Sequence, residues 1–111
     1  MSDNRVIRMA EIEVGPDFLD DHKRFLGEEI DLSLEREPGV LRLEAVSLRE
    51  APCQFRLLEV YANQAAYENH LQSEHFLTYK ARTSHMVVSL RLLDAVALRM
   101  TSSSPQKLTN P

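Results

Sequence analysis

The sequence predicts an α+β fold of the ferredoxin-like split βαβ type, with a four-stranded antiparallel sheet and helices on one face. Two observations predict it. Segments with apolar residues at every second position alternate with segments in which apolar residues recur every three or four positions. Read along the chain, these segments give the order strand, helix, strand, strand, helix, strand, which is the order of this fold.

The first strand is expected at residues 5–14, where apolar residues alternate with two glutamates. Gly15-Pro16 ends it, and Asp17 is a suitable N-cap for a helix that runs to about Glu35. Gly27 lies inside this helix, and we expect the position to tolerate a cost of about 1 kcal/mol relative to alanine. The residues expected to face the core are Phe18, His22, Phe25, Leu26, Ile30 and Leu34.

A hairpin is expected in the middle of the chain. Pro38-Gly39 ends the first helical segment, and residues 40–48 alternate again as a second strand. A short polar connection at residues 49–53 leads to a third strand at residues 54–62.

Two capped helical segments and a last strand complete the prediction. Asn63 is a good N-cap for a segment that ends at about residue 71, and Ser73 opens another that runs toward residue 87. The fourth strand is expected at residues 91–100.

Size and composition predict a single domain at residues 1–100, followed by a tail at residues 101–111 that lacks periodicity. The chain has 111 residues, of which 43% are hydrophobic and 27% charged. Its formal net charge of -4 argues against nucleic acid as a partner. It contains no apolar run of the roughly 20 residues that a membrane span needs. The single cysteine, Cys53, allows no internal disulfide, so we expect a cytoplasmic protein.

The third strand predicts a homodimer. Phe55 and Leu57 lie on one of its faces and Leu58 and Val60 on the other, so both faces are too apolar to leave one bare to water. Because the helices are needed on one face, we expect a second copy to cover the other.

Four residues are candidates for proton-transfer chemistry. Glu59 and Tyr61 share a strand face, and His70 and His75 come from the helical segments that follow. A buried carboxylate beside an imidazole or phenol can have its pKa moved toward neutrality, which is what such chemistry needs. Packing roles would leave the same pattern, so both interpretations stay open.

Metal and thiol chemistry are not expected. Glu59, His70 and His75 have the right atom types for a three-ligand site, but their spacing matches no known metal motif and no cysteine pair supports it. Cys53 shows no local sign of a depressed pKa. The three glycines stand apart, so there is no phosphate-binding loop and a nucleotide cofactor is not expected either.

The middle of the chain resembles a known family. Glu37-Pro38-Gly39-Val40, the strand that ends in Glu59-Val60-Tyr61, and the runs Ala66 to Leu71 and Ser73 to Phe76 together resemble the antibiotic biosynthesis monooxygenases, which are dimeric α+β barrels. Residues 59–76 also look like the corresponding part of the enzyme that isomerises phosphorylated autoinducer-2.

The resemblance implies a cofactor-independent monooxygenase that oxidises a small quinol- or phenol-like substrate with O2. It implies one pocket per subunit of a homodimer, between sheet and helices, and chemistry without flavin, haem or metal. We expect His75 to act as base or proton shuttle, Tyr61 to donate to a substrate oxygen, and Glu59 or His70 to orient the reacting groups.

The expected substrate-binding residues are Arg42, Leu57 and Phe76. Two alternatives stay open. One is a proton-transfer isomerase of a small phosphorylated carbonyl compound, for which Arg42 is the candidate phosphate ligand. The other is a dimeric binder of small ligands without catalytic activity.

Overall fold

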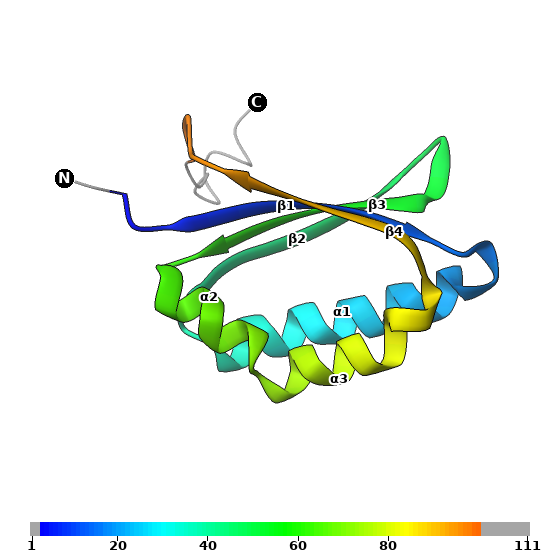
Figure 1. The fold of residues 1–111 in the computed structure, drawn as a ribbon, viewed down its shortest axis with the longest axis horizontal. Helices are drawn as coiled ribbons and strands as arrows, with labels where there is room; N and C mark the ends of the chain where they lie inside the picture. Colours follow the sequence, from blue (N-terminus) through cyan, green and yellow to red (C-terminus); the bar gives the residue numbers. More distant parts are fainter. Residues whose placement is uncertain (1–2, 101–111) are drawn as a thin grey trace, which may run out of the picture.

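The computed structural model describes residues 3–100. Four strands form one antiparallel sheet in the order β2-β3-β1-β4, and the helices cover one of its faces (Figure 1). The α+β ferredoxin-like class is therefore confirmed. The elements are β1 (Val6–Val14), α1 (Leu19–Arg36), β2 (Val40–Leu48), β3 (Ala51–Tyr61), α2 (Gln64–Leu71), α3 (Glu74–Thr83) and β4 (Val87–Ala95), with 3-10 turns at Pro16–Phe18 and Ser84–Met86.

The first half of the chain follows the prediction closely, with two corrections. Asp17 does not cap α1, because it lies inside the 3-10 turn and the helix begins after Phe18 without a side-chain cap. The connection between β2 and β3 is a turn of only two residues, Arg49 and Glu50, so β3 begins at Ala51 instead of residue 54.

The last strand differs most from the prediction. The helical segment stops at Thr83, and β4 spans Val87–Ala95 where residues 91–100 were expected. The two adjacent valines at 87 and 88 favour extended backbone, because β-branched side chains pack well on a pleated surface. The predicted tail at residues 101–111 lies outside the described residues.

The buried stripe of α1 also departs from the prediction. Leu34 is 47% exposed, whereas Glu29 and Ser33 are buried. Gly27 has nothing within 4 Å of where a Cβ would stand, which agrees with the expectation that the position merely tolerates glycine.

The main core lies between α1 and the centre of the sheet. Its buried members are Ala10, Ile12, Val14, Leu26, Phe55, Leu57 and Met86. A smaller cluster of Val40, Leu43 and Tyr61 packs toward α2. No helix within residues 3–100 combines the length and apolar character that crossing a membrane requires.

Candidate functional site

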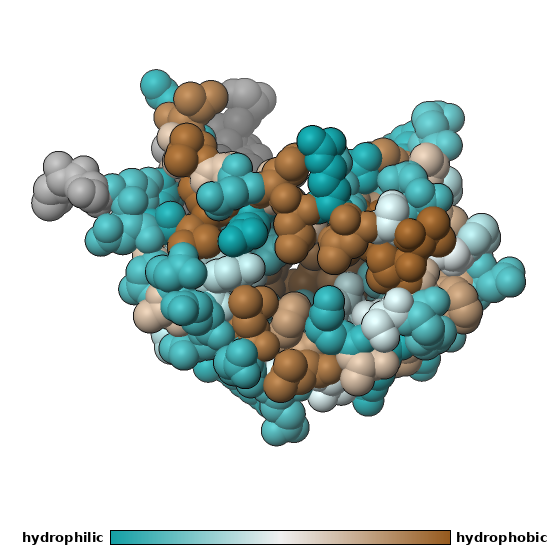
Figure 2. All heavy atoms as spheres, viewed as in Figure 1, coloured by the Kyte–Doolittle hydropathy of each residue, from teal (hydrophilic) through white to brown (hydrophobic). Residues whose placement is uncertain are grey.

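A cavity of about 130 Å³ lies between the sheet and the helices. Its walls are mostly apolar and include Ala10, Leu26, Leu57, Leu71, Phe76 and Leu92. Leu90 and Leu92 of the edge strand β4 face this side and are about half exposed, at 48% and 49%. Figure 2 shows the surface hollowed between β4 and the helices, with hydrophobic residues along the rim. Since a protein cavity of about 150 Å³ can hold benzene, the size suits one aromatic ring.

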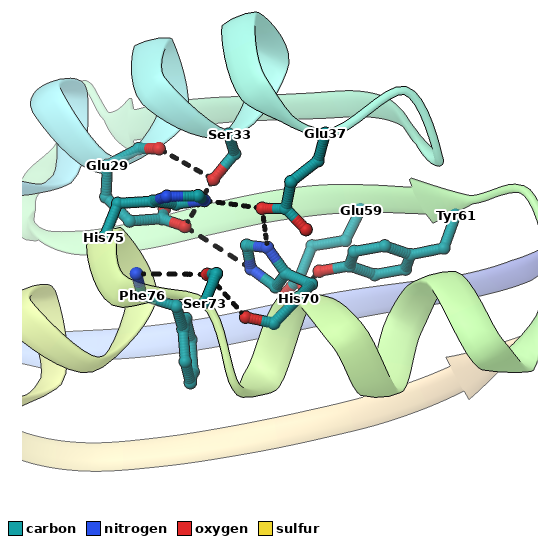
Figure 3. A network of polar contacts seen from close by, with 9 residues as sticks. All are labelled: Glu29, Ser33, Glu37, Glu59, Tyr61, His70, Ser73, His75 and Phe76. Atoms are coloured by element: carbon teal, nitrogen blue, oxygen red, sulfur yellow. Dashed lines mark hydrogen bonds and ion pairs between the residues drawn. The ribbon is translucent and has the colours of Figure 1, made fainter.

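Two polar residues of the cavity wall, Glu29 and His70, belong to a connected network, which we define as Glu29, Ser33, Glu37, His70 and His75 (Figure 3). The carboxylate of Glu37 is its centre: one oxygen, Oε2, lies 2.9 Å from His70 Nδ1 and 2.5 Å from His75 Nε2. Both imidazole side chains are 4% exposed, and that of Glu37 is 15% exposed. One carboxylate therefore joins two buried histidines from different helices.

Glu29 holds the other side of His70. Its Oε1 lies 3.3 Å from His70 Nε2 and accepts a hydrogen bond of 2.9 Å from the Ser33 hydroxyl. Burial raises the pKa of the Glu29 carboxyl above its ordinary value, although the Ser33 hydroxyl and the nearby histidines oppose the shift. The His70 ring thus lies between two carboxyl groups.

Glu59 and Tyr61 form a second, shorter pair. The Tyr61 hydroxyl donates to Glu59 Oε1 at 2.6 Å, which confirms that the two residues share one face of β3. Burial, reinforced by the neighbouring Glu59 carboxylate, raises the pKa of Tyr61 well above its ordinary range. The phenol therefore stays protonated and acts as a fixed donor.

The turn after α1 explains why Glu37 reaches the histidines. A residue before proline disfavours helical backbone, so α1 ends at Arg36 and Glu37, preceding Pro38, is extended, with φ -116° and ψ 101°. At Gly39 an added Cβ would stand 2.5 Å from the Cβ of Ala66, so glycine lets α2 pack closely against this turn.

Ser73 fixes the two histidines relative to each other. Its hydroxyl donates to the carbonyl oxygen of His70 at 2.7 Å and accepts from the backbone N–H of Phe76 at 3.3 Å. It thereby closes α2 and caps α3, as the sequence predicts for the cap. Asn63 caps α2 in the predicted way, by accepting from the backbone N–H of Ala66.

The four predicted catalytic residues lie in different places. Glu59 and His70 line the cavity. Tyr61 is fully buried behind Glu59 and is not among the lining residues. His75 lies on the other side of Glu37 and lines a separate groove between α1 and α3.

The predicted substrate-binding residues are also divided. Leu57 and Phe76 line the cavity. Arg42 does not, because it pairs in register with Val60 and so lies on the opposite face of the sheet, 3.8 Å from Glu44. The cations that line the cavity are instead Arg8 and Lys80.

Sequence reasoning missed three members of the network: Glu29, Ser33 and Glu37. The signal that could have found them is their spacing, because residues four apart form one column along a helix. Glutamate and serine at such positions are usually solvated, so the column becomes informative only once the histidines opposite it are known.

Glu37, His70 and His75 are also the residues that could hold a metal ion, since their ligand atoms all lie within 4.8 Å of one another. The predicted trio contained Glu59 in place of Glu37. Ligand atoms around a tetrahedral zinc ion lie about 3.3 Å apart, from bonds of about 2.0 Å. The hydrogen bonds of Glu37 are shorter, at 2.9 and 2.5 Å, so an ion would have to open both. That the site works without metal stays a prediction.

A further polar pair lies between α1 and α3. His22 is fully buried, and its Nε2 lies 3.1 Å from the hydroxyl of Tyr79. Burial lowers the pKa of His22 and raises that of Tyr79 to about 12. Both groups are therefore held neutral, and of the two only Tyr79 lines the cavity.

Comparison with known proteins identifies the family. The sequence model of the antibiotic biosynthesis monooxygenases matches residues 5–82. A candidate antibiotic biosynthesis monooxygenase from Bacteroides thetaiotaomicron is 40% identical, with a TM-score of 0.87 over 91% of this chain and 96% of that one.

Two further solved structures share the fold. A candidate monooxygenase from Lactobacillus acidophilus is 28% identical, with a TM-score of 0.83 over 86% of this chain and 45% of that longer one. A candidate antibiotic biosynthesis monooxygenase from Nitrosomonas europaea is 19% identical, also with a TM-score of 0.83, over 92% of this chain and 98% of that one. A comparison with curated proteins finds no match. Because the family model matches residues 5–82 of the 111, this chain belongs to the antibiotic biosynthesis monooxygenase family.

Proposed function

We propose that the protein is a cofactor-independent monooxygenase that oxidises a small quinol- or phenol-like substrate with O2. The observation that carries the proposal is the cavity itself, an apolar chamber suited to one aromatic ring with His70, Glu29 and Glu59 in its wall. Family membership supports the reaction class.

The reaction balances without a further reductant. A quinol and O2 give a hydroxyquinone and water: one oxygen atom enters the ring, the other leaves as water, and the substrate supplies all the electrons. Deprotonation comes first, because the quinolate passes an electron to O2 far more readily than the neutral quinol. The protein therefore needs to remove a proton, to stabilise developing negative charge and to exclude bulk water.

The His70 and Glu29 pair is the proposed proton acceptor. Both residues line the cavity, and they share a contact of 3.3 Å. Burial raises the pKa of Glu29, so its carboxylate is a stronger base than that of an ordinary glutamate, and the imidazole beside it can exchange a proton with it. A proton taken from the substrate by His70 would thus enter a ring whose Nδ1 is already hydrogen-bonded to Glu37.

His75 is proposed to act as the proton shuttle. Glu37 connects it to His70 through one oxygen atom, and His75 borders the groove between α1 and α3 on the far side of the network from the cavity. A proton can therefore leave the site through the helix layer without opening the cavity to water.

Glu59 is proposed to orient the substrate by accepting a hydrogen bond from its hydroxyl group. Tyr61 already occupies Oε1 of this carboxylate, which leaves Oε2 for a ligand. Tyr61 thus acts through Glu59, and its direct donation to a substrate oxygen, as the sequence suggested, would require it to give up that bond.

The apolar walls favour an aromatic substrate over a phosphorylated carbonyl compound. Arg42, the expected phosphate ligand of such an isomerase, lies on the other face of the sheet. A non-catalytic ligand binder has the same cavity and is distinguished by experiment.

We also propose a homodimer built on the outer face of the sheet. Met9 and Leu58 pair there in register and are only partly buried, and Val46 on the same face is 59% exposed. A second copy would cover these apolar side chains.

Oxygen uptake tests the proposed activity. Purified protein, treated with chelator, is incubated with substituted hydroquinones in an oxygen electrode, and products are identified by mass spectrometry with ¹⁸O2. We expect one ¹⁸O atom per product and one O2 consumed per turnover. Isomerised product formed without O2 would support the isomerase, and saturable binding without turnover would support the binder.

A further inference from the structure

Among the described residues that line the cavity, Arg8 is the cation that belongs to the sheet. On β1 it stands in register with Glu59 of β3 and Asp94 of β4, so its side chain projects toward the helices. Its guanidinium carbon lies 4.7 Å above the ring of Tyr67, which also lines the cavity. A guanidinium that lies over an aromatic ring keeps its N–H groups available to hydrogen-bond acceptors.

The charge of Arg8 is poorly compensated within the described residues. Its Nε is buried and has no hydrogen-bond partner. The nearest carboxylate oxygen in an ion pair is that of Asp94 at 3.9 Å, and the Asp94 side chain is 80% exposed. Glu59 stands opposite, but it accepts the Tyr61 hydroxyl. A ligand cannot reach the buried Nε, but the Arg8 side chain is 26% exposed and lines the cavity, so an anionic ligand can pair with the terminal N–H groups of the guanidinium.

The rest of the wall is compatible with an anion. Lys80 adds a second cation to the lining. The two acids of the wall are Glu29, in which burial favours the protonated form, and Glu59, whose Oε1 already bonds a phenol. Around them the walls are apolar, which strengthens any charge pairing inside.

We infer that the natural substrate is an aromatic hydroxy acid, whose carboxylate binds the guanidinium of Arg8 while its ring fills the apolar chamber. The aromatic part rests on the proposed function, and the acidic part rests on Arg8 alone. A planar fork of N–H donors matches a carboxylate with two parallel hydrogen bonds, which gives orientation as well as affinity. Arg8 is then the residue that selects the substrate, at a distance from the proton-handling network.

The test compares two ligands of nearly the same size and shape, one with a carboxylate and the other with a neutral amide in its place. Binding of 2,5-dihydroxybenzoate and of its neutral amide, 2,5-dihydroxybenzamide, is measured by calorimetry without O2. We expect the wild-type protein to bind the acid at least about 10-fold more tightly. In Arg8→Gln the preference should disappear while the affinity for the amide stays the same, which also shows that the cavity is intact. Arg8→Lys keeps the charge without the fork and should fall between.

Arg24→Gln is the matched control. It removes the same charge from an exposed residue of α1 that also lies over an aromatic ring, that of Phe25, and that does not line the cavity, so it should leave the preference unchanged. The inference is overturned if the wild-type protein shows no preference, if it binds neither ligand, or if the preference survives in Arg8→Gln. Tighter binding of ribose 5-phosphate than of the acid, lost in Arg8→Gln, would assign the anion to a phosphosugar and overturn the aromatic class.

The two proposals fail separately. If the acid is preferred through Arg8 but no quinol consumes O2, the oxygenase function fails and the acidic ligand stands. If neutral quinols are oxidised and the acid has no advantage, the function stands and the role of Arg8 fails.

Discussion

The residues of the network are buried or partly buried, and they contact one another through polar atoms. Glu37 Oε2 contacts both His70 and His75, and Glu29 is held by Ser33 and His70. A buried polar group is tolerated when it has a hydrogen-bond partner. Removing that partner destabilises the folded protein, because the remaining group is still desolvated and no bond compensates for it. Substitutions at these positions should therefore change the activity through the loss of a particular contact.

His70 and His75 should differ in how strongly they affect turnover. His70→Ala removes the proposed acceptor at the cavity wall, so kcat should fall by about 100-fold or more. His75→Ala removes only the shuttle behind it, so kcat should fall by about 10-fold, with little change in KM and a larger solvent deuterium isotope effect. Full activity in both variants, together with a lower melting temperature, would show that the histidines only pack the helices.

Tyr61→Phe removes the hydroxyl donor and keeps the aromatic ring. It keeps the packing against Tyr67 and His70 and deletes the hydrogen bond to Glu59. Because Tyr61 acts through Glu59, we expect a smaller loss than in His70→Ala, and the two losses should combine less than additively in the double variant. Steady-state kinetics of the three variants provide the comparison.

His22 should make the stability depend on pH. Its folded-state pKa is lowered by burial, so between that value and its ordinary value of 6.5 the unfolded chain binds the proton more readily. The contribution of His22 is therefore fully present above pH 6.5 and is lost as the pH falls through the folded pKa. Urea unfolding from pH 8 to pH 5 measures it.

The free energy of unfolding of the wild-type protein should fall relative to that of His22→Leu as the pH is lowered. His85→Gln, which replaces an exposed histidine, controls for the loss of one such residue. A difference between the wild-type protein and His22→Leu that stays constant over the whole pH range would contradict the assignment.

Among the elements, two glycines have opposite structural roles. Gly27 in α1 has open space where a Cβ would stand, whereas at Gly39 a Cβ would come within 2.5 Å of Ala66 on α2. Gly27→Ala should raise the free energy of unfolding by about 0.5–1 kcal/mol, because alanine is the better helix former.

Gly39→Ala should lower the free energy of unfolding by about 1–3 kcal/mol, because α2 must move away from the turn. It should also lower kcat, since α2 carries His70. Urea midpoints of the two variants, measured side by side, check both signs. A neutral Gly39→Ala would mean that α2 adjusts without cost.

Elements with a clear period were predictable, and those that depend on tertiary contacts were not. The bounds of β2 follow from its alternation between Pro38-Gly39 and the next turn. β4 was misplaced because residues 84–90 fit a helix and a strand equally well, and only pairing with β1 decides between them.

The candidate site was predictable to a similar extent. The Tyr61 hydroxyl bonds Glu59, and the ring of His70 lies 5.3 Å from that of Tyr61 and 6.1 Å from that of His75, but only Glu59 and His70 line the cavity. The carboxylate that joins the two histidines could not be found from them, because Glu37 is 33 and 38 residues away in sequence.

At the scale of the whole molecule, the two faces of the sheet have different surroundings. The inner face packs against the helices and encloses the cavity, while Met9, Val46 and Leu58 lie on the outer face. Since the exposed apolar area is best covered by a second sheet, we expect sedimentation velocity to give about twice the 12.7 kDa of one chain at micromolar concentration.

Val46→Lys places a charge on the outer face of the sheet and should shift the dimer toward monomer, because a lysine is costly to bury without a partner. Leu34→Lys, on the exposed side of α1, is its control. A stable monomer of the wild-type chain would contradict the dimer. The cytoplasmic location expected from the sequence stays a prediction.

The edge strand β4 contributes Leu90 and Leu92 to the cavity wall and no residue to the network. The shape of the cavity on this side can therefore change independently of the residues that are proposed to move protons. A directed-evolution library confined to these two positions could widen or narrow the entrance for differently shaped rings. Meanwhile Glu37, His70 and His75 would keep their contacts, so the shape of the entrance can change without disturbing the network.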